Sequence, residues 1–208
     1  MKKPLCLCLA LLCIVSLTGC RNPFGGVADR KPVIYLYPTE EMDVTVTLTY
    51  DGTLTHTYPA YENGWRVTAQ PDGTLTDAAG REYYCLFWEG VGDTEYDFSR
   101  GFCVAGSNTA AFLEDALTQL GLTEKEANEF IIYWLPRMER NPYNLIAFQT
   151  DAYTDNAVLD IAPTPDSMLR VFMVFKALDK PIEIEEPEIV LFERRGFCVV
   201  EWGGSEIK

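Results

Sequence analysis

The chain has 208 residues, of which 48% are hydrophobic, 23% charged and 12% aromatic. This is the composition of a globular protein rather than a disordered one. The 31 acidic residues outnumber the 17 basic residues, which gives a formal net charge of −14 at pH 7. Nucleic acid and anionic lipid headgroups repel a protein this acidic. We therefore expect no nucleic-acid partner.

The first 19 residues have the zones of a bacterial export signal. Lys2 and Lys3 form a positive start, and residues 5–16 are almost wholly apolar. This apolar run is shorter than the ~20 residues that a transmembrane helix needs, and it matches the central part of a signal peptide. We interpret residues 1–19 as a signal peptide.

The end of this segment, Leu17-Thr18-Gly19-Cys20, resembles the lipobox of bacterial lipoproteins. The resemblance implies that a diacylglyceryl group is attached to the thiol of Cys20 and that a peptidase cuts just before it. Two acyl chains hold a protein stably on a membrane. We expect a protein anchored through lipid on Cys20 to the extracytoplasmic face of the cell membrane. An ordinary secretory signal that happens to end in Cys is the alternative.

The rest of the chain divides into a short tether and one domain. Residues 20–31 comprise the lipidated Cys and a Gly-containing stretch that we predict to be flexible. From residue 32 to residue 208 no linker-like break occurs, which predicts a single globular domain. Its opening, Lys-Pro-Val-Ile-Tyr-Leu-Tyr-Pro at 31–38, resembles an uncharacterised family of bacterial exported proteins. The likeness implies a single exported domain and no particular activity.

The first part of the domain has the alternating pattern of β-strands. Asp51-Gly52 separates two alternating segments, 44–50 and 54–58, and this dipeptide is the strongest short-range signal of a β-hairpin. We therefore expect those two segments to pair. Further strands are predicted over 33–37, 65–69 and 83–88.

The middle of the domain changes to helical spacing. Asn108 is the expected cap of a helix over 109–120, and Gly121 is its expected end. Thr123 and Glu126 have the spacing of a capping box, which predicts a second helix ending near residue 130.

β-character then returns and continues to the end of the chain. The β-branched and aromatic segment 131–136 favours a strand. The remaining predicted strands lie at 144–149, 157–161, 168–176 and 197–202. We predict an α+β fold, mainly antiparallel β, with a helical pair inserted at about 108–130.

Three cysteines remain in the mature domain, Cys85, Cys103 and Cys198. The last two lie in identical pentapeptides, Arg-Gly-Phe-Cys-Val, at 100–104 and 195–199. Two matching strands could be neighbours joined by a disulfide, or both thiols could be free. Duplication of a sequence unit is one explanation of the repeat, and chance is the other.

Motifs of catalysis and cofactor binding are missing from the sequence. His56 is the only histidine, and its polar neighbours indicate the protein surface. The Gly-x-Ser-x-Gly, His-Glu-x-x-His, phosphate-loop and Gly-x-Gly-x-x-Gly motifs do not occur. We therefore assign no catalytic residue, no metal ligand and no cofactor.

A pair of carboxylates is the alternative, since two acids suffice for glycoside hydrolysis. Glu82 and Glu89 flank the apolar segment 83–88, and Glu201 stands beside Trp202. A catalytic acid needs burial to raise its pKa, and the borders of apolar segments can supply it. A glycosidase-like envelope hydrolase is therefore the second hypothesis.

Two acidic segments are further candidate sites. Asp93, Glu95 and Asp97 have the first spacings of a calcium loop, but Phe98 stands where that loop needs Gly. A looser calcium site and a solvated turn both stay open. The acidic segment 183–188 is expected to be an exposed edge.

Aromatic residues provide the binding hypothesis. Tyr35 and Tyr37 alternate on one face of the first strand, and Tyr58, Tyr61 and Trp65 bracket a loop. Exposed aromatic rings stack on sugars or contact protein partners, whereas core packing is the alternative role. The first hypothesis is a membrane-anchored, non-catalytic domain that binds an envelope protein, glycan or small ligand.

Overall fold

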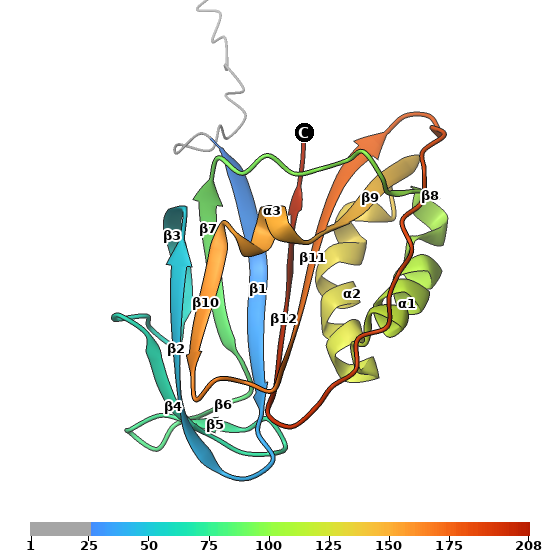
Figure 1. Cartoon of the computed structure of the whole chain (residues 1–208). Coiled ribbons are helices and arrows are strands. Elements are labelled where there is room, and N and C mark those ends of the chain that lie inside the picture. Colours follow the sequence, from blue (N-terminus) through green and yellow to red (C-terminus); the bar gives the residue numbers. More distant parts are fainter. Residues whose placement is uncertain (1–25) are drawn as a thin grey trace, which may run out of the picture.

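The computed structural model describes residues 26–208, so the predicted signal peptide and Cys20 lie outside the described residues. Two β-sheets and a helical pair form three layers, with the seven-stranded sheet in the middle (Figure 1). All strand pairs are antiparallel except β11 with β12. The predicted α+β class with an inserted helical pair is confirmed.

The elements have the following bounds. The seven-stranded sheet contains, in spatial order, β3 (Gly52–Tyr58), β7 (Leu86–Gly92), β1 (Val27–Tyr37), β12 (Cys198–Glu206), β11 (Ser167–Leu178), β9 (Tyr143–Gln149) and β8 (Phe102–Ala105). The five-stranded sheet contains β10 (Ala157–Ala162), β2 (Met42–Tyr50), β4 (Trp65–Ala69), β5 (Leu75–Thr76) and β6 (Glu82–Tyr83). The helices are η1 (Gly106–Asn108), α1 (Thr109–Leu120), α2 (Glu124–Met138) and α3 (Asp151–Thr154).

The central strand β1 separates two hydrophobic clusters. Ile34 and Leu36 face the five-stranded sheet, whereas Val33 and Tyr35 face the helices. A strand covered on both faces reads as a continuous apolar run, which is why residues 33–37 carry so little polarity.

Helix α1 has the predicted bounds, but it lacks the predicted side-chain cap. Asn108 makes no capping hydrogen bond and instead ends the short helix η1. Gly121 ends α1 with a φ of 98°, a conformation that favours glycine. The capping box of Thr123 and Glu126 at the start of α2 is confirmed. Within residues 26–208, no helix combines the length and apolar character needed to cross a membrane.

The segment 131–136 continues α2, so the predicted strand is wrong. Phe130, Trp134 and Met138 recur at every fourth position and are fully buried, whereas Ile132 is 74% exposed. Helical spacing places one apolar stripe against the sheet, and this packing outweighs the β-propensity of the segment.

Asp51-Gly52 forms a corner between the sheets, so the predicted hairpin is wrong as well. Strand β2 pairs with β10 and β4, whereas β3 pairs with β7. A side chain at Gly52 would place its Cβ 2.5 Å from the carbonyl oxygen of Val91. Alternation of apolar residues fixes the buried face of each strand, but it does not choose the partner strand.

Strand β1 begins at Val27, so residues 27–31 belong to the sheet and not to the tether. Ala28 pairs with Val91, and Arg30 pairs with Gly204. The sequence pattern does not predict this part of the strand, because its residues are mostly polar. Asp29 is nevertheless buried there, in a hydrogen-bonded cluster.

Cys85, Cys103 and Cys198 are free thiols, so the disulfide alternative is wrong. Cys103 lies on the edge strand β8 and Cys198 on the interior strand β12, with β9 and β11 between them. The two copies of the pentapeptide therefore occupy different environments within one sheet.

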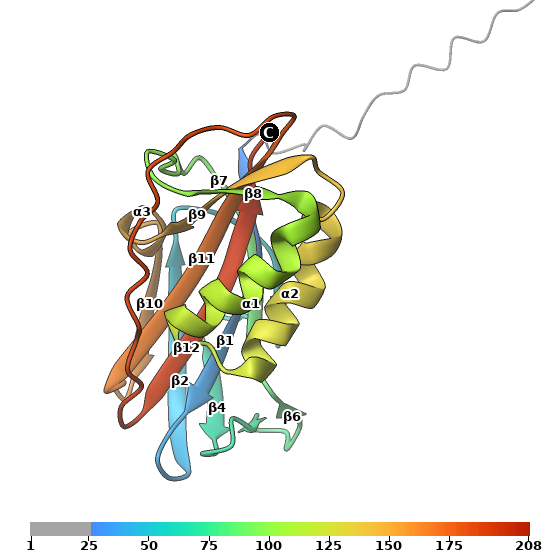
Figure 2. The same cartoon turned by 90° about the vertical axis from the view of Figure 1, so that its right-hand side faces the viewer.

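The segment 179–197 connects β11 to its parallel neighbour β12 and runs beside α1, on the side away from α2 (Figure 2). Its Ile182 N–H contacts the sulfur of Cys103, and Arg194 donates to the carbonyl oxygen of Gly121 at 2.9 Å. Arg194 also pairs with Glu126. The glutamates of 183–188 are exposed as predicted, in irregular backbone rather than an edge strand.

Candidate functional site

A cavity of about 550 Å³ lies beside α2, on the part of the helix-facing sheet surface that β1, β7 and β3 form. Its volume is within the range of small-ligand sites. We call it the aromatic slot. The slot is lined by Lys31, Val33, Tyr58, Arg81, Glu82, Tyr83, Tyr84, Cys85, Phe87, Glu89 and Tyr133.

The side of the slot on β1 is shaped by a β-bulge. The register of β1 shifts between residues 30 and 33 against β12 and between residues 29 and 33 against β7. Lys31 stands in this bulge with a φ of 57°, a left-handed conformation that costs a non-glycine residue about 1–3 kcal/mol. Bulges often redirect a side chain near a functional site. Here the bulge places Lys31 in the wall of the slot.

Aromatic side chains form most of the walls. Tyr58 and Tyr83 meet edge to face with ring centroids 5.5 Å apart. Tyr58 is 51% exposed and Tyr84 is 53% exposed. Phe87 from β7 and Tyr133 from α2 are half-buried. The slot therefore offers ring surface to a ligand without being closed to solvent.

Charged groups of both signs lie among these rings. The ammonium of Lys31 is 5.9 Å from the ring centroid of Phe87 and 5.7 Å from that of Tyr133. The guanidinium of Arg81 is 5.8 Å from the ring centroid of Tyr83. Such distances allow cation–π attraction.

The predicted candidates Glu82 and Glu89 line the same slot, and His56 lies beside it. Glu89 accepts a hydrogen bond from the Lys31 backbone N–H at 3.2 Å, and its other oxygen is 3.7 Å from His56 Nδ1. His56 is on the surface, as predicted, with a side chain that is 70% exposed. Glu82 is also exposed.

Cys85 is a neutral group on the floor of the slot. Burial raises the pKa of its thiol to about 12, with the nearby Glu129 carboxylate adding to the effect. A thiol with this pKa is protonated at neutral pH and is a poor nucleophile.

Glu201, the third candidate acid, lies in the core between the sheets. Its side chain is fully buried and pairs with Arg170 at 2.7 Å, and Trp88 Nε1 donates to it at 3.2 Å. Arg170 also donates to the carbonyl oxygen of Ala157 at 2.7 Å. These contacts give Glu201 a structural role away from the aromatic slot.

Sequence reasoning missed a second buried carboxylate, Asp29. Its oxygens accept hydrogen bonds from Tyr96 at 2.6 Å, Ser205 at 2.8 Å and Tyr50 at 2.9 Å. Burial raises the pKa of Asp29, and these three hydrogen bonds oppose the rise only in part. No local motif signals this cluster, because its members come from distant parts of the chain.

Most of the aromatic residues singled out from sequence are structural. Tyr35 and Tyr37 do share a face, but their stacked rings lie under α2 and their hydroxyls donate to Glu129 and Glu126. Tyr61 binds the backbone of residue 48, and Trp65 is buried in the core between the sheets. Among the five, Tyr58 alone lines the slot.

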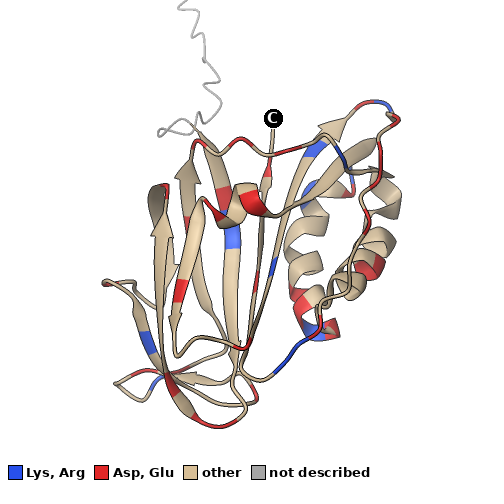
Figure 3. Cartoon of the chain, in the orientation of Figure 1, with Lys and Arg blue, Asp and Glu red and all other residues tan. Residues whose placement is uncertain are grey.

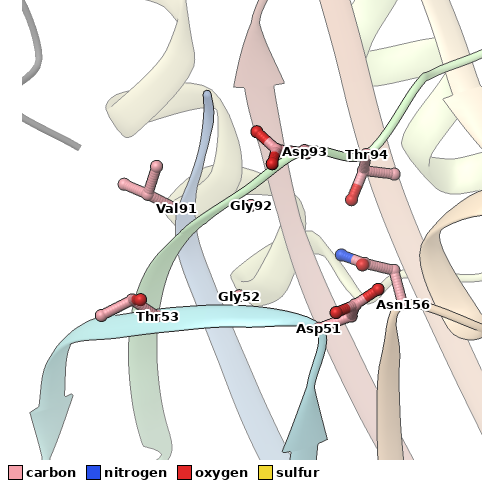
Figure 4. A pocket seen from close by; sticks show the side chains of 8 residues that line it. All are labelled: Asp51, Gly52, Thr53, Val91, Gly92, Asp93, Thr94 and Asn156. Atoms are coloured by element: carbon pink, nitrogen blue, oxygen red, sulfur yellow. The ribbon is translucent and has the colours of Figure 1, made fainter. Parts of the chain in front are cut away.

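The predicted acidic loop does not gather its three acids around one point. Asp97 accepts from the N–H and hydroxyl of Ser99. Asp93 instead lines a different cavity of about 360 Å³, where Asn156 lies beside Asp51 (Figure 4). Within residues 26–208, no three His, Cys, Asp or Glu side chains form a metal-binding cluster.

Acidic positions are spread over strands, helices and connections, with fewer basic positions between them (Figure 3). The aromatic slot departs from this distribution, because Lys31 and Arg81 balance Glu82 and Glu89 there.

Comparison with known proteins gives one bacterial relative. The chain is 38% identical over 82 residues to the "Uncharacterized protein in bglA 3'region" of Butyrivibrio fibrisolvens, and the match covers 37% of this chain and 84% of that protein. No family model matches the chain, and no solved structure matches it. Because the match spans most of the relative, the chain belongs to the same family as this bacterial protein.

Proposed function

We propose that the protein is a lipid-anchored, extracytoplasmic binding protein that holds a glycan in the aromatic slot. The observation that carries the proposal is the slot itself: ring faces, charges of both signs and a strained bulge converge on one open cavity. Ligand sites combine apolar walls with a few polar groups that orient the ligand.

The chemistry of the walls suits a sugar. A pyranose ring has an apolar face that stacks on an aromatic ring and hydroxyl groups that hydrogen-bond at its edge. Phe87 from β7 and Tyr133 from α2 supply ring surface on two sides. The Arg137 guanidinium covers one face of Tyr133, 4.0 Å from its ring centroid, and the ring's other face is available to a ligand. Arg81 and Glu82 supply donors and acceptors at the mouth.

The anchor proposal rests on the lipobox that ends at Cys20. Strand β1 begins at Val27, so six residues separate it from Cys20. At ~3.5 Å per extended residue, such a segment reaches at most about 20 Å. The domain would therefore stay close to the headgroups, with its ligand supplied by the surrounding envelope.

The binding proposal is tested on the full chain, purified in mild detergent and titrated with neutral and acidic oligosaccharides. We expect Tyr133→Ala to weaken glycan binding by about tenfold, because a stacking contact is lost. Tyr143→Ala is the matched control, since Tyr143 lies on β9 outside the slot. Binding that is equal in both variants would contradict the proposal, as would a failure of every glycan to bind.

The second candidate function is hydrolysis, favoured by one observation: Glu82 and Glu89 line the same cavity. Binding remains the better supported function, because Glu82 is exposed and lacks the burial that a catalytic acid needs. If glycan cleavage is detected, Glu89→Gln should abolish it while the thermal unfolding midpoint stays unchanged. Cleavage that persists in Glu89→Gln would exclude the pair.

A further inference from the structure

Lys31 is held toward the slot by its backbone. The φ of 57° and the double register shift place this residue alone in the left-handed region between regular parts of β1. The Glu89 carboxylate fixes the bulge by accepting the Lys31 N–H. The side-chain ammonium is thereby directed to the rings of Phe87 and Tyr133.

The two cations of the slot lack carboxylate partners. Among residues 26–208, neither Lys31 nor Arg81 forms a salt bridge, although five such pairs involve other basic residues. Two cations without a salt bridge therefore line this one cavity, in a chain that carries 31 acidic residues. Their polar contacts are left for a ligand.

The two carboxylates of the slot leave both cations free to contact a ligand. Glu89 is already engaged by the Lys31 N–H and by His56, and Glu82 is exposed to solvent. The protein's own cations lie within 5.9 Å of the ring centroids of Phe87, Tyr133 and Tyr83. They would repel a cationic ligand placed at these rings.

We infer that the ligand of the aromatic slot is an acidic saccharide, one whose sugar ring carries a carboxylate. The inference rests on the proposed glycan-binding function and names its ligand class. The ring stacks on Phe87 or Tyr133, and the carboxylate accepts hydrogen bonds from Lys31 or Arg81. Hydrogen bonds between charged partners are stronger than neutral ones.

The test compares uronic acid trisaccharides with their methyl esters, which keep the sugar rings and remove the charge. The full chain in mild detergent is titrated calorimetrically with trigalacturonate, triglucuronate and trimannuronate, each beside its ester. We expect at least one acid to bind about tenfold more tightly than its ester. Lys31→Gln should remove that preference, and Arg81→Gln should reduce it.

The control is Arg66→Gln, which removes one exposed positive charge on β4, outside the slot. It should retain the preference for the acid. Equal binding of acid and ester would overturn the inference, and if Tyr133→Ala still weakened that binding, the proposed function would stand. If only neutral glycans bound, the inference would again fail and the proposed function would again stand. If no saccharide of either kind binds, both the inference and the proposed function fail.

Discussion

At the scale of single residues, the most constrained groups are the two carboxylates buried between the sheets. Glu201 is balanced by the charge of Arg170, whereas Asp29 has only hydroxyl donors. The two sites therefore respond differently to substitution.

Replacing Arg170 should be strongly destabilising. The side chains of Arg170 and Glu201 are 9% and 0% exposed, so Arg170→Met leaves a buried charge unpaired. Loss of one partner of such a pair lowers the free energy of unfolding by about 3–5 kcal/mol. Urea denaturation provides the measurement. The double variant Arg170→Met/Glu201→Gln should recover part of the loss, and a double variant no more stable than the single one would contradict this account.

Asp29 should make stability depend on pH. The pKa of Asp29 is higher in the folded protein than its ordinary value, so the folded state holds the proton more tightly. Its contribution is fully present below about pH 4 and is lost as the pH rises through the folded pKa. The wild-type protein should therefore lose stability relative to Asp29→Asn above about pH 4. A difference in unfolding free energy that stays constant up to about pH 8 would show that the pKa is not raised.

At the scale of elements, the decisive case is the segment 131–136. Ile132 and Trp134 would share a face in a strand, but in α2 they lie on different sides. Trp134→Ala should cost about 3–5 kcal/mol of stability, because it empties a fully buried site. Ile132→Ala should cost less than about 0.5 kcal/mol. Thermal and urea unfolding of the two variants measure this contrast, and similar losses would indicate a strand.

Some features of the elements could be predicted from the sequence, and others could not. The capping box at Thr123 and the glycine after α1 located the helical pair, because these signals act within a few residues. The end of α2 and the partner of β2 could not be predicted, since distant strands determine them. Local sequence patterns predict which face of an element is buried, but they do not predict which elements pack beside it.

Residues of the candidate site could likewise be predicted only where a local pattern marks them. Tyr58, Glu82 and Glu89 were identified as candidates from sequence and meet in the aromatic slot. The sequence places Lys31 in a predicted tether and Tyr133 in a predicted strand, so it connects neither residue with these three. The bulge at Lys31 has no local signature, because it depends on register with both neighbouring strands.

At the scale of the whole molecule, the proposed membrane location depends on the proposed lipid at Cys20. Cys20→Ser should stop incorporation of a fatty-acid label and shift the protein from the membrane fraction to the soluble fraction, because the acyl chains supply the membrane affinity. Cys103→Ser keeps Cys20 intact and is the control. Continued labelling of Cys20→Ser would show that another residue carries the lipid.

The central claim is that a glycan occupies the aromatic slot. The most direct measurement is fluorine NMR of the full chain with 3-fluorotyrosine placed at position 133 alone, titrated with the uronic acid trisaccharides and their esters. The account predicts that the resonance at Tyr133 shifts and saturates as the ligand is added, whereas 3-fluorotyrosine at Tyr143 does not respond. A ligand that binds while the Tyr133 resonance stays unchanged would contradict it.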